Sequence, residues 1–258
     1  MPFVKGIHYS FHQSKEIDPS RPPLILIHGA GGSFLSFHPY LRRLQGETIY
    51  APDLPGHGKS EGEGKSSIQE YADDIAHFMD SLHIEEAVIV GLSMGSGIAL
   101  TLALKYPHKV KALALMGGGA KLRVAQSTLD HVGNPETFEA TVEAVNRACF
   151  SSYASEELVA LSKKAMLDAG PAVLLGDYLA CNQFDVTTQL EQIQIPTLIL
   201  CGAEDVMTPP KHSQYLKDHL PNAQLHILEK TGHMLTLEQP EAVMKLLKQF
   251  LDEVPLLS

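Results

Sequence analysis

A five-residue stretch, GLSMG at positions 91–95, constrains the fold more than any other part of the chain. The residues before it, Ala87 to Val90, are small or β-branched and uncharged, which is typical of a buried strand. The residues after it, as far as Lys105, are mostly apolar and predict a well-buried helix. A serine between two glycines, where a strand turns into a helix, is the pattern of a nucleophile elbow.

Ser93 at the centre of this turn is open to two interpretations. In the first, glycines are needed because larger side chains two positions either side of the serine would clash. The turn then presents the serine hydroxyl at a helix N-terminus, where the helix dipole favours developing negative charge. In the second, this is a glycine-rich structural turn with an incidental serine. The strand and the helix on either side favour the first interpretation.

Short apolar segments alternate with helical patterns along most of the chain. This alternation predicts an α/β fold with a mostly parallel, doubly wound sheet and helices on both faces. Residues 4–13 are expected to add one or two antiparallel edge strands. Strands are predicted at 24–28, 48–51, 87–90, 110–116, 197–201 and 224–228, and helices at 36–44, 68–82, 95–106, 212–219 and 240–251.

Residues 121–194 interrupt the alternation, because they contain helical patterns and no convincing strand. We therefore expect a helical insertion after the sixth strand. Long insertions at such loops often form lids over a site. The predicted organisation is a core domain of residues 1–120 and 195–258 with a helical cap, or lid, of residues 121–194.

Composition excludes several kinds of partner. The formal net charge of −10 argues against binding to nucleic acid or to an anionic membrane. The three cysteines, Cys149, Cys181 and Cys201, offer neither a disulfide framework nor metal-ligand spacing. The chain begins without an apolar signal segment, and no apolar run is long enough to span a membrane. A soluble, cytoplasmic protein is expected.

A serine hydroxyl is a weak nucleophile at neutral pH, so chemistry at Ser93 requires a histidine base and an orienting acid. Asp205 follows the predicted strand 197–201, and His233 lies in the loop after the predicted strand 224–228. The order serine, aspartate, histidine matches the hydrolase-type triad order. Glu204 is the alternative acid, but its side chain should point elsewhere. The other twelve histidines are expected mostly in helices or hydrophilic loops, where a solvated surface position is the default.

A nucleophile of this kind also needs an oxyanion hole, formed by donors directed at the tetrahedral oxygen. We expect one donor to be the N–H of Met94, directly after the nucleophile. The other is expected from the glycine-rich loop HGAGG at 28–32, where Ala30 is the predicted donor. A phosphate-binding loop is the rival interpretation. The chain has neither GxxxxGK[ST] nor GxGxxG here, so a nucleotide site is not expected.

Taken together, these stretches resemble the α/β-hydrolase fold family over essentially the whole chain. The matching segments are HGAGGS, DLPGHGKS, GLSMG, GAEDVMTP and GHMLTLEQP, in this order and at sensible spacing. The resemblance implies a serine esterase of the carboxylesterase type with a helical cap. It also implies that Ser93 is the nucleophile, Asp205 the acid and His233 the base.

The resemblance gives His28 and the Asp53 turn supporting rather than chemical positions. Ser96 departs from the pattern, since many relatives have a further glycine there. This change should be tolerable at the start of a helix.

The expected reaction is acyl transfer from a small or medium ester to water, without metal or cofactor. Dehalogenases and epoxide hydrolases of the family would need a carboxylate in place of Ser93, and the chain contains no tryptophan, on which other relatives rely. Met207 and Met234, with Met94, are predicted to form an adaptable apolar wall for the substrate. Ordinary core positions for these methionines are equally open.

Two other functions remain open. A relative that cleaves C–C bonds in ring-fission products, or opens an enol-lactone, would use the same triad. Its carboxylated substrate could be held by Arg123 or Arg147 of the cap, although solvated positions suit both residues. A ligand-sensing protein with slow or no turnover could also keep the triad. The oligomeric state cannot be read from the sequence.

Overall fold

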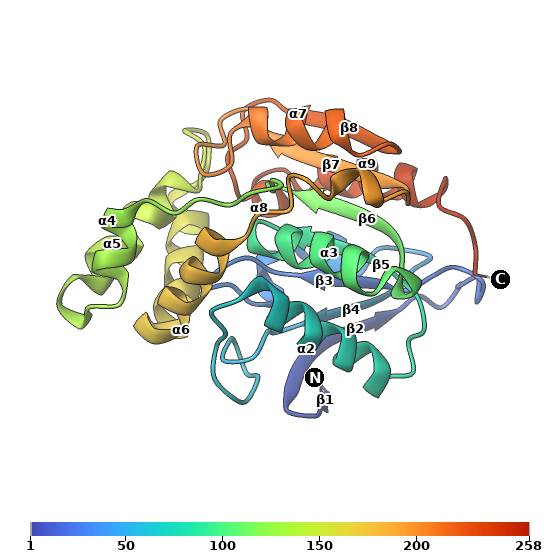
Figure 1. Ribbon diagram of the computed structural model, residues 1–258, viewed down its shortest axis with the longest axis horizontal. Helices are drawn as coiled ribbons and strands as arrows, with labels where there is room; N and C mark the ends of the chain where they lie inside the picture. The colour runs from blue at the N-terminus through green and yellow to red at the C-terminus, as the bar shows by residue number, and fades with distance from the viewer. Residues whose placement is uncertain (1, 258) are drawn as a thin grey trace.

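A computed structural model describes residues 2–257 and contains one eight-stranded sheet in the order β1-β2-β4-β3-β5-β6-β7-β8 (Figure 1). β1 pairs with β2 and β2 pairs with β4 in antiparallel fashion, whereas the remaining neighbours pair in parallel. The mostly parallel sheet and its antiparallel edge are thus confirmed. The strands are β1 Phe3–Val4, β2 Ile7–Gln13, β3 Leu24–Ile27, β4 Thr48–Pro52, β5 Ala87–Leu92, β6 Val110–Met116, β7 Thr197–Gly202 and β8 Ala223–Leu228.

Helices cover both faces of the sheet, because successive side chains of each central strand point to opposite faces. In β3, Ile25 and Ile27 pack in the core with α2, α3 and α7, whereas Leu24 and Leu26 pack on the other face with α1 and α9. The helices are α1 Pro39–Arg42, α2 Ile68–Ser81, α3 Met94–Lys105, α4 Gln126–Val132, α5 Pro135–Ala148, α6 Glu156–Gln183, α7 Pro210–His219, α8 Leu235–Glu238 and α9 Pro240–Leu251.

The predicted helix 36–44 is wrong in extent. The segment instead forms a 3₁₀ turn, Phe34–Ser36, followed by the short α1. Pro39 explains the break, because a residue that precedes proline favours an extended backbone, and His38 has a ψ of 150°.

A helical segment lies between β6 and β7, as expected for an insertion after the sixth strand. It contains α4, α5 and α6, which project beyond one end of the sheet (Figure 1). Within α6, Gly170 leaves the helical conformation with a φ of 81°, directly before Pro171. Lys121 and Asp185 form an isolated bridge between the two ends of the segment. The division into core and cap at 121 and 194 stays a prediction.

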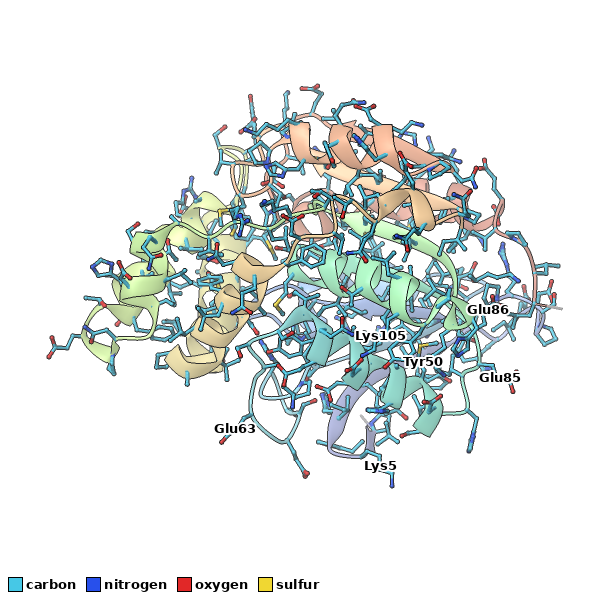
Figure 2. All side chains as sticks on the ribbon, in the orientation of Figure 1. Lys5, Tyr50, Glu63, Glu85, Glu86 and Lys105 are labelled. Atoms are coloured by element: carbon cyan, nitrogen blue, oxygen red, sulfur yellow. The ribbon has the colours of Figure 1, made fainter. Side chains whose placement is uncertain are left out.

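Charged side chains project outward around the core, as Glu63 and Glu85 do in Figure 2. Within residues 2–257, no helix has the length and apolarity needed to cross a membrane.

Candidate active site

The elbow at residues 91–95 has the geometry that its glycines predict. β5 ends at Leu92, α3 begins at Met94, and Ser93 between them has a φ of 55°. A Cβ on Gly91 would lie 2.2 Å from the carbonyl oxygen of Gly95, and a Cβ on Gly95 would lie 2.1 Å from that of Ile27. Both distances are impossible contacts, so the tight turn at Ser93 requires glycine at these two positions. The positive φ at a serine is itself a strained conformation of the kind that clusters at functional sites.

Ser96 does more than fit at the start of α3. Its side chain is fully buried. Its hydroxyl donates to the carbonyl oxygen of Gly91 at 2.8 Å, and the carbonyl oxygen of Met116 lies 3.2 Å from the same hydroxyl. The Ser96 hydroxyl therefore links α3 to the ends of β5 and β6.

Asp205 and His233 form a buried pair. Asp205 Oδ2 lies 2.8 Å from His233 Nδ1, and the two residues are 3% and 4% exposed. The other oxygen, Oδ1, accepts the backbone N–H groups of Met207 and Thr208. Burial alone would raise the pKa of Asp205. The charge and hydrogen bond of His233, together with the bonds from Thr208, outweigh burial and hold that pKa below its usual value. The aspartate is therefore ionised and can orient the imidazole.

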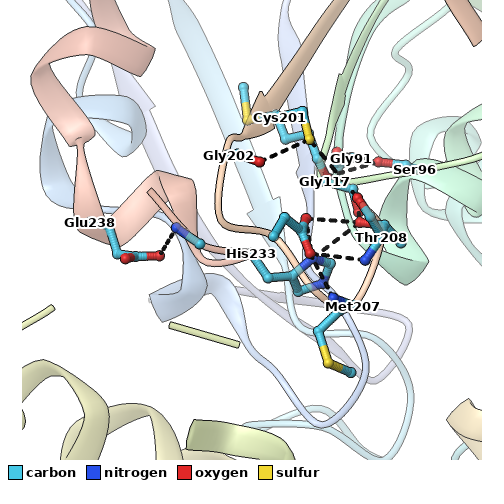
Figure 3. A network of polar contacts seen from close by, with 12 residues as sticks. Gly91, Ser96, Gly117, Cys201, Gly202, Met207, Thr208, His233 and Glu238 are labelled. Atoms are coloured by element: carbon cyan, nitrogen blue, oxygen red, sulfur yellow. Dashed lines mark hydrogen bonds and ion pairs between the residues drawn. The ribbon is translucent and has the colours of Figure 1, made fainter. Parts of the chain in front are cut away.

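Thr208 belongs to this arrangement and was missed from sequence. Its Oγ1 lies 2.9 Å from both Asp205 Oδ2 and the carbonyl oxygen of Gly117, and 3.2 Å from His233 Nδ1 (Figure 3). The hydroxyl has one proton to donate, which these two oxygens share. The available signal was a threonine three residues after an aspartate in a turn, a spacing that favours such local bonds.

Hydrogen bonds join the loop that carries His233 to the helical insertion. The N–H groups of His233 and Met234 both donate to the carbonyl oxygen of Cys149. The Glu238 carboxylate accepts the N–H of Gly232, shown in Figure 3, and also that of Ser151. The insertion and the histidine loop are therefore one connected unit.

Glu204, the alternative acid, points elsewhere as expected. Its carboxylate accepts the backbone N–H and the hydroxyl of Ser152. It forms no hydrogen bond with His233 within the residues that the structure describes.

Ser93 and His233 line the same cavity, of about 540 Å³, between the sheet edge and the insertion. Met207 and Met234 also line it, whereas the Met94 side chain is fully buried in the core and forms no part of this wall. Contact of the first two methionines with substrate stays a prediction. The insertion contributes lining residues that are mostly apolar but include a lysine and an aspartate: Val145, Cys149, Leu158, Leu161, Ser162, Lys164, Ala165, Met166, Asp168 and Tyr178.

The glycine-rich loop after β3 has a free N–H at the cavity, that of Ala30. The N–H of Gly32 donates to the carbonyl oxygen of Gly29, and the N–H of Gly31 donates to Asp177. The N–H of Ala30, which lines the cavity, has no hydrogen bond to any residue in 2–257. The N–H of Met94 is free as well, since the first residue of a helix has no intrahelical acceptor. These are the two groups predicted as oxyanion donors.

The expectation of solvated histidines is wrong for His8 and His57, which are 1% and 0% exposed. His8 Nδ1 lies 2.7 Å from Oδ2 of Asp53, and the other oxygen of Asp53 accepts the N–H of Phe34. Each buried ring is paired with a carboxylate from a distant part of the chain. Sequence pattern could not find these pairs, because the partners are far apart along the chain.

His28 is buried and neutral. Its Nδ1 lies 2.8 Å from the carbonyl oxygen of Gly29, so that nitrogen carries the proton, and Nε2 accepts the N–H of Leu54. Burial and the nearby His57 lower the pKa of His28 to about 3. The ring thus braces the glycine-rich loop against the turn after β4.

The part of the chain that the structure describes holds no cluster of three or more His, Cys, Asp or Glu side chains that could bind a metal ion. The three cysteines are free and buried, and burial raises the pKa of the Cys149 thiol to about 12. A thiol with that pKa is not ionised at neutral pH and is a poor nucleophile.

Fold and cavity together are those of an α/β hydrolase, and the comparisons agree. A model of the α/β hydrolase fold family matches residues 22–167 and 160–240, so the chain belongs to that family. It is 31% identical to 2-hydroxymuconate semialdehyde hydrolase of Pseudomonas putida over 261 residues. The alignment covers 90% of this chain and 87% of that protein.

Two further relatives are esterases. Pimeloyl-(acyl-carrier protein) methyl ester esterase of Neisseria meningitidis serogroup C is 28% identical over 260 residues, covering 94% of this chain and 98% of that protein. The solved structure of a thermophilic esterase has a TM-score of 0.83 at 28% identity, covering 98% of this chain and 96% of the other. The chain is therefore a member of a hydrolase family that includes esterases.

Proposed function

We propose that this protein is a serine hydrolase that cleaves carboxylic esters of small to medium acyl chains through an acyl-enzyme. The observation that carries the proposal is the arrangement of three residues around one cavity. Ser93 stands on a strained turn at the cavity wall, His233 lines the same wall, and Asp205 is bonded to the far nitrogen of that histidine.

Each group has a defined role in the proposed cycle. His233 Nε2 takes the proton of Ser93 as the serine oxygen attacks the ester carbonyl carbon. Asp205 fixes the proton of His233 on Nδ1 and stabilises the imidazolium without taking that proton. The N–H groups of Ala30 and Met94 bind the oxyanion. His233 then protonates the departing alcohol and activates water, which releases the acid and restores the serine.

The size and the lining of the cavity support the acyl-length assignment. A volume of about 540 Å³, with a mainly apolar lining surface, accommodates a small or medium ester. The insertion, residues 121–194, acts as the cap in this proposal, because its side chains close one side of the cavity. Leu35 and Leu161, both lining residues, are 56% and 61% exposed and mark an apolar entrance.

The test measures initial rates on p-nitrophenyl acetate, butyrate, octanoate and laurate, with stoichiometric labelling by a fluorophosphonate. We expect the shorter esters to react fastest and one equivalent of label to attach at Ser93. A preference for laurate would contradict the acyl-length assignment, and label at another residue would contradict the choice of nucleophile.

A second candidate, a C–C hydrolase or enol-lactonase acting on a carboxylated substrate, is favoured by one observation. Arg42 lines the cavity, and its Nε–H donates to the carbonyl oxygen of Phe37 at 2.8 Å. Burial and the charge of Arg43 lower the pKa of its guanidinium, and no carboxylate of residues 2–257 forms an ion pair with it. Arg123 and Arg147, the clamp candidates named from sequence, do not line this cavity. They bond instead to the Asn182 carbonyl oxygen and to Glu156, both outside the cavity lining.

Steady-state kinetics on p-nitrophenyl butyrate and on a ring-fission dienone acid separate the two candidates. If the dienone acid is the better substrate and Arg42→Gln raises its KM while exposed Arg43→Gln does not, the second candidate replaces the first. Hydrolysis of the ester alone supports the first.

A further inference from the structure

Asp177, a fully buried residue of α6, makes polar contacts between the insertion and the core. Its Oδ2 accepts the backbone N–H of Gly31 at 2.8 Å and lies 2.8 Å from His57 Nε2. Its Oδ1 accepts the hydroxyl of Tyr71 at 2.6 Å. One carboxylate of the insertion therefore joins the loop after β3, the loop after β4 and α2.

The hydrogen-bond partners of His57 define the charge state of this cluster. Its Nδ1 lies 3.0 Å from the carbonyl oxygen of Pro55 and its Nε2 faces Asp177, so both ring nitrogens face acceptors and both carry protons. Burial alone would lower the pKa of His57, but the charge and hydrogen bond of Asp177 outweigh burial and raise it. Tyr71 accepts the N–H of Lys65 and donates to Asp177. The cluster is an imidazolium–carboxylate pair with every polar atom of the carboxylate bonded.

Such a buried ion pair is weak evidence for stability, since apolar side chains could fill the same space at less cost in desolvation. Its placement suggests a different reason for the charge. The N–H that Asp177 accepts belongs to Gly31, next to the predicted oxyanion donor Ala30.

The four residues 29–32 form a type II turn. The N–H of Gly32 donates to the carbonyl oxygen of Gly29 at 3.1 Å, Gly31 has a φ of 62°, and Ala30 has a negative φ. In a type II turn the central peptide can flip to give type I, which reverses the direction of the Gly31 N–H. Asp177 opposes that flip, because the Ala30 carbonyl oxygen would then face a carboxylate. The Ala30 N–H belongs to the preceding peptide, which the flip does not turn, so Asp177 acts on that group by anchoring the whole turn through the Gly31 N–H.

The same helix packs directly on the turn. A Cβ on Gly31 would lie 2.8 Å from Leu174 Cδ1 and 3.5 Å from Met166 Cγ, both on α6. Leu174 lies three residues before Asp177 and therefore on the same face of the helix. Ala30 packs against the apolar cluster of the insertion that contains these two side chains.

We propose that Asp177 is a positioning residue for ester hydrolysis: it anchors the 29–32 turn at the place on the core from which the Ala30 N–H reaches the cavity. The position of the insertion on the core thereby determines the placement of this oxyanion donor. This inference rests on the proposed function, because it assigns a role in that same site.

The test is a double-mutant cycle on kcat between Asp177→Ala and Ala30→Pro, with active sites counted by fluorophosphonate titration. Proline removes the Ala30 N–H and fits the second position of a type II turn. We expect Asp177→Ala alone to lower kcat about 10-fold to 100-fold, the scale of a slightly misplaced catalytic group, with little change in KM. In the Ala30→Pro background, the same substitution should change kcat by no more than about twofold.

Three controls keep the result interpretable. Asp177→Asn keeps the shape and one oxygen acceptor, so it should fold and should lose less activity than Asp177→Ala. Tyr71→Phe removes the hydroxyl that donates to the far oxygen of Asp177 and accepts the Lys65 N–H, and it leaves the bond to Gly31 in place. The melting temperature should therefore fall while kcat per active site stays close to that of the wild type. Losses of kcat that multiply in the double variant would overturn the inference. An unaltered kcat in Ala30→Pro alone would instead count against the oxyanion hole of the proposed function.

Discussion

Ala30→Pro tests the assignment of the oxyanion donor with little other change in the chain. The residue occupies the second position of a type II turn, where proline is common because its ring fixes φ near −65°. The Ala30 N–H has no partner among residues 2–257, so no hydrogen bond of the folded chain is lost. The turn bond from Gly32 to Gly29 remains available, and the melting temperature should stay close to that of the wild type.

The expected effect lies in catalysis. Removal of one donor of an oxyanion hole costs about 10²-fold to 10³-fold in kcat, or about 2.7–4 kcal/mol of transition-state stabilisation. The assay is steady-state hydrolysis of p-nitrophenyl butyrate by the wild type, Ala30→Pro and Ala30→Ser, which keeps the N–H. Ala30→Ser should retain most of the kcat. If Ala30→Pro is folded and keeps more than about a tenth of the wild-type kcat, the N–H of Ala30 is not an oxyanion donor.

Further predictions concern the triad, the elbow and the buried imidazolium. Asp205→Asn should lower kcat about 10⁴-fold through the wrong histidine tautomer, and a loss confined to KM would contradict its role. Gly95→Ala should destabilise the fold by about 1–3 kcal/mol in denaturant unfolding, because its Cβ would meet a strand carbonyl at 2.1 Å. Gly97→Ala, whose Cβ meets nothing closer than 3.4 Å, should not, so equal losses would refute the steric argument. Because the pKa of His57 is raised on folding, its stabilisation is complete below about pH 6.5 and is lost as pH rises through the folded-state value. The difference in unfolding free energy between wild type and His57→Gln should therefore shrink with rising pH, and a constant difference would contradict an imidazolium.

The parts of the fold that sequence predicts are those governed by local rules. Apolar, β-branched segments such as 87–90 predict their strands, and the glycines of the elbow predict a turn that no Cβ could enter. The order of Ser93, Asp205 and His233 predicts which loops meet, since the carboxyl ends of parallel strands share one edge of the sheet. The predicted helix 36–44 fails for a local reason too, because Pro39 favours an extended backbone at His38, which interrupts the helix.

Contacts between distant segments explain what sequence could not predict. Asp177 lies 146 positions from Gly31 and 120 from His57, and it sits in a helix whose pattern gives no sign of a buried carboxylate. The role of Thr208 could not be predicted, because it depends on contacts with His233 and Gly117, which are distant along the chain. Arg42 falls in the same class, since it lines the cavity from a helix outside the insertion.

The most direct test of the account compares hydrolysis of p-nitrophenyl butyrate by the wild type, Ser93→Ala and Ser96→Ala. Ser96 is a buried serine one turn along the same helix, so its loss controls for damage to the elbow. We expect Ser93→Ala to lower kcat by about 10⁴-fold or more, whereas Ser96→Ala should keep kcat per folded molecule close to that of the wild type. Wild-type activity in Ser93→Ala would contradict the serine nucleophile.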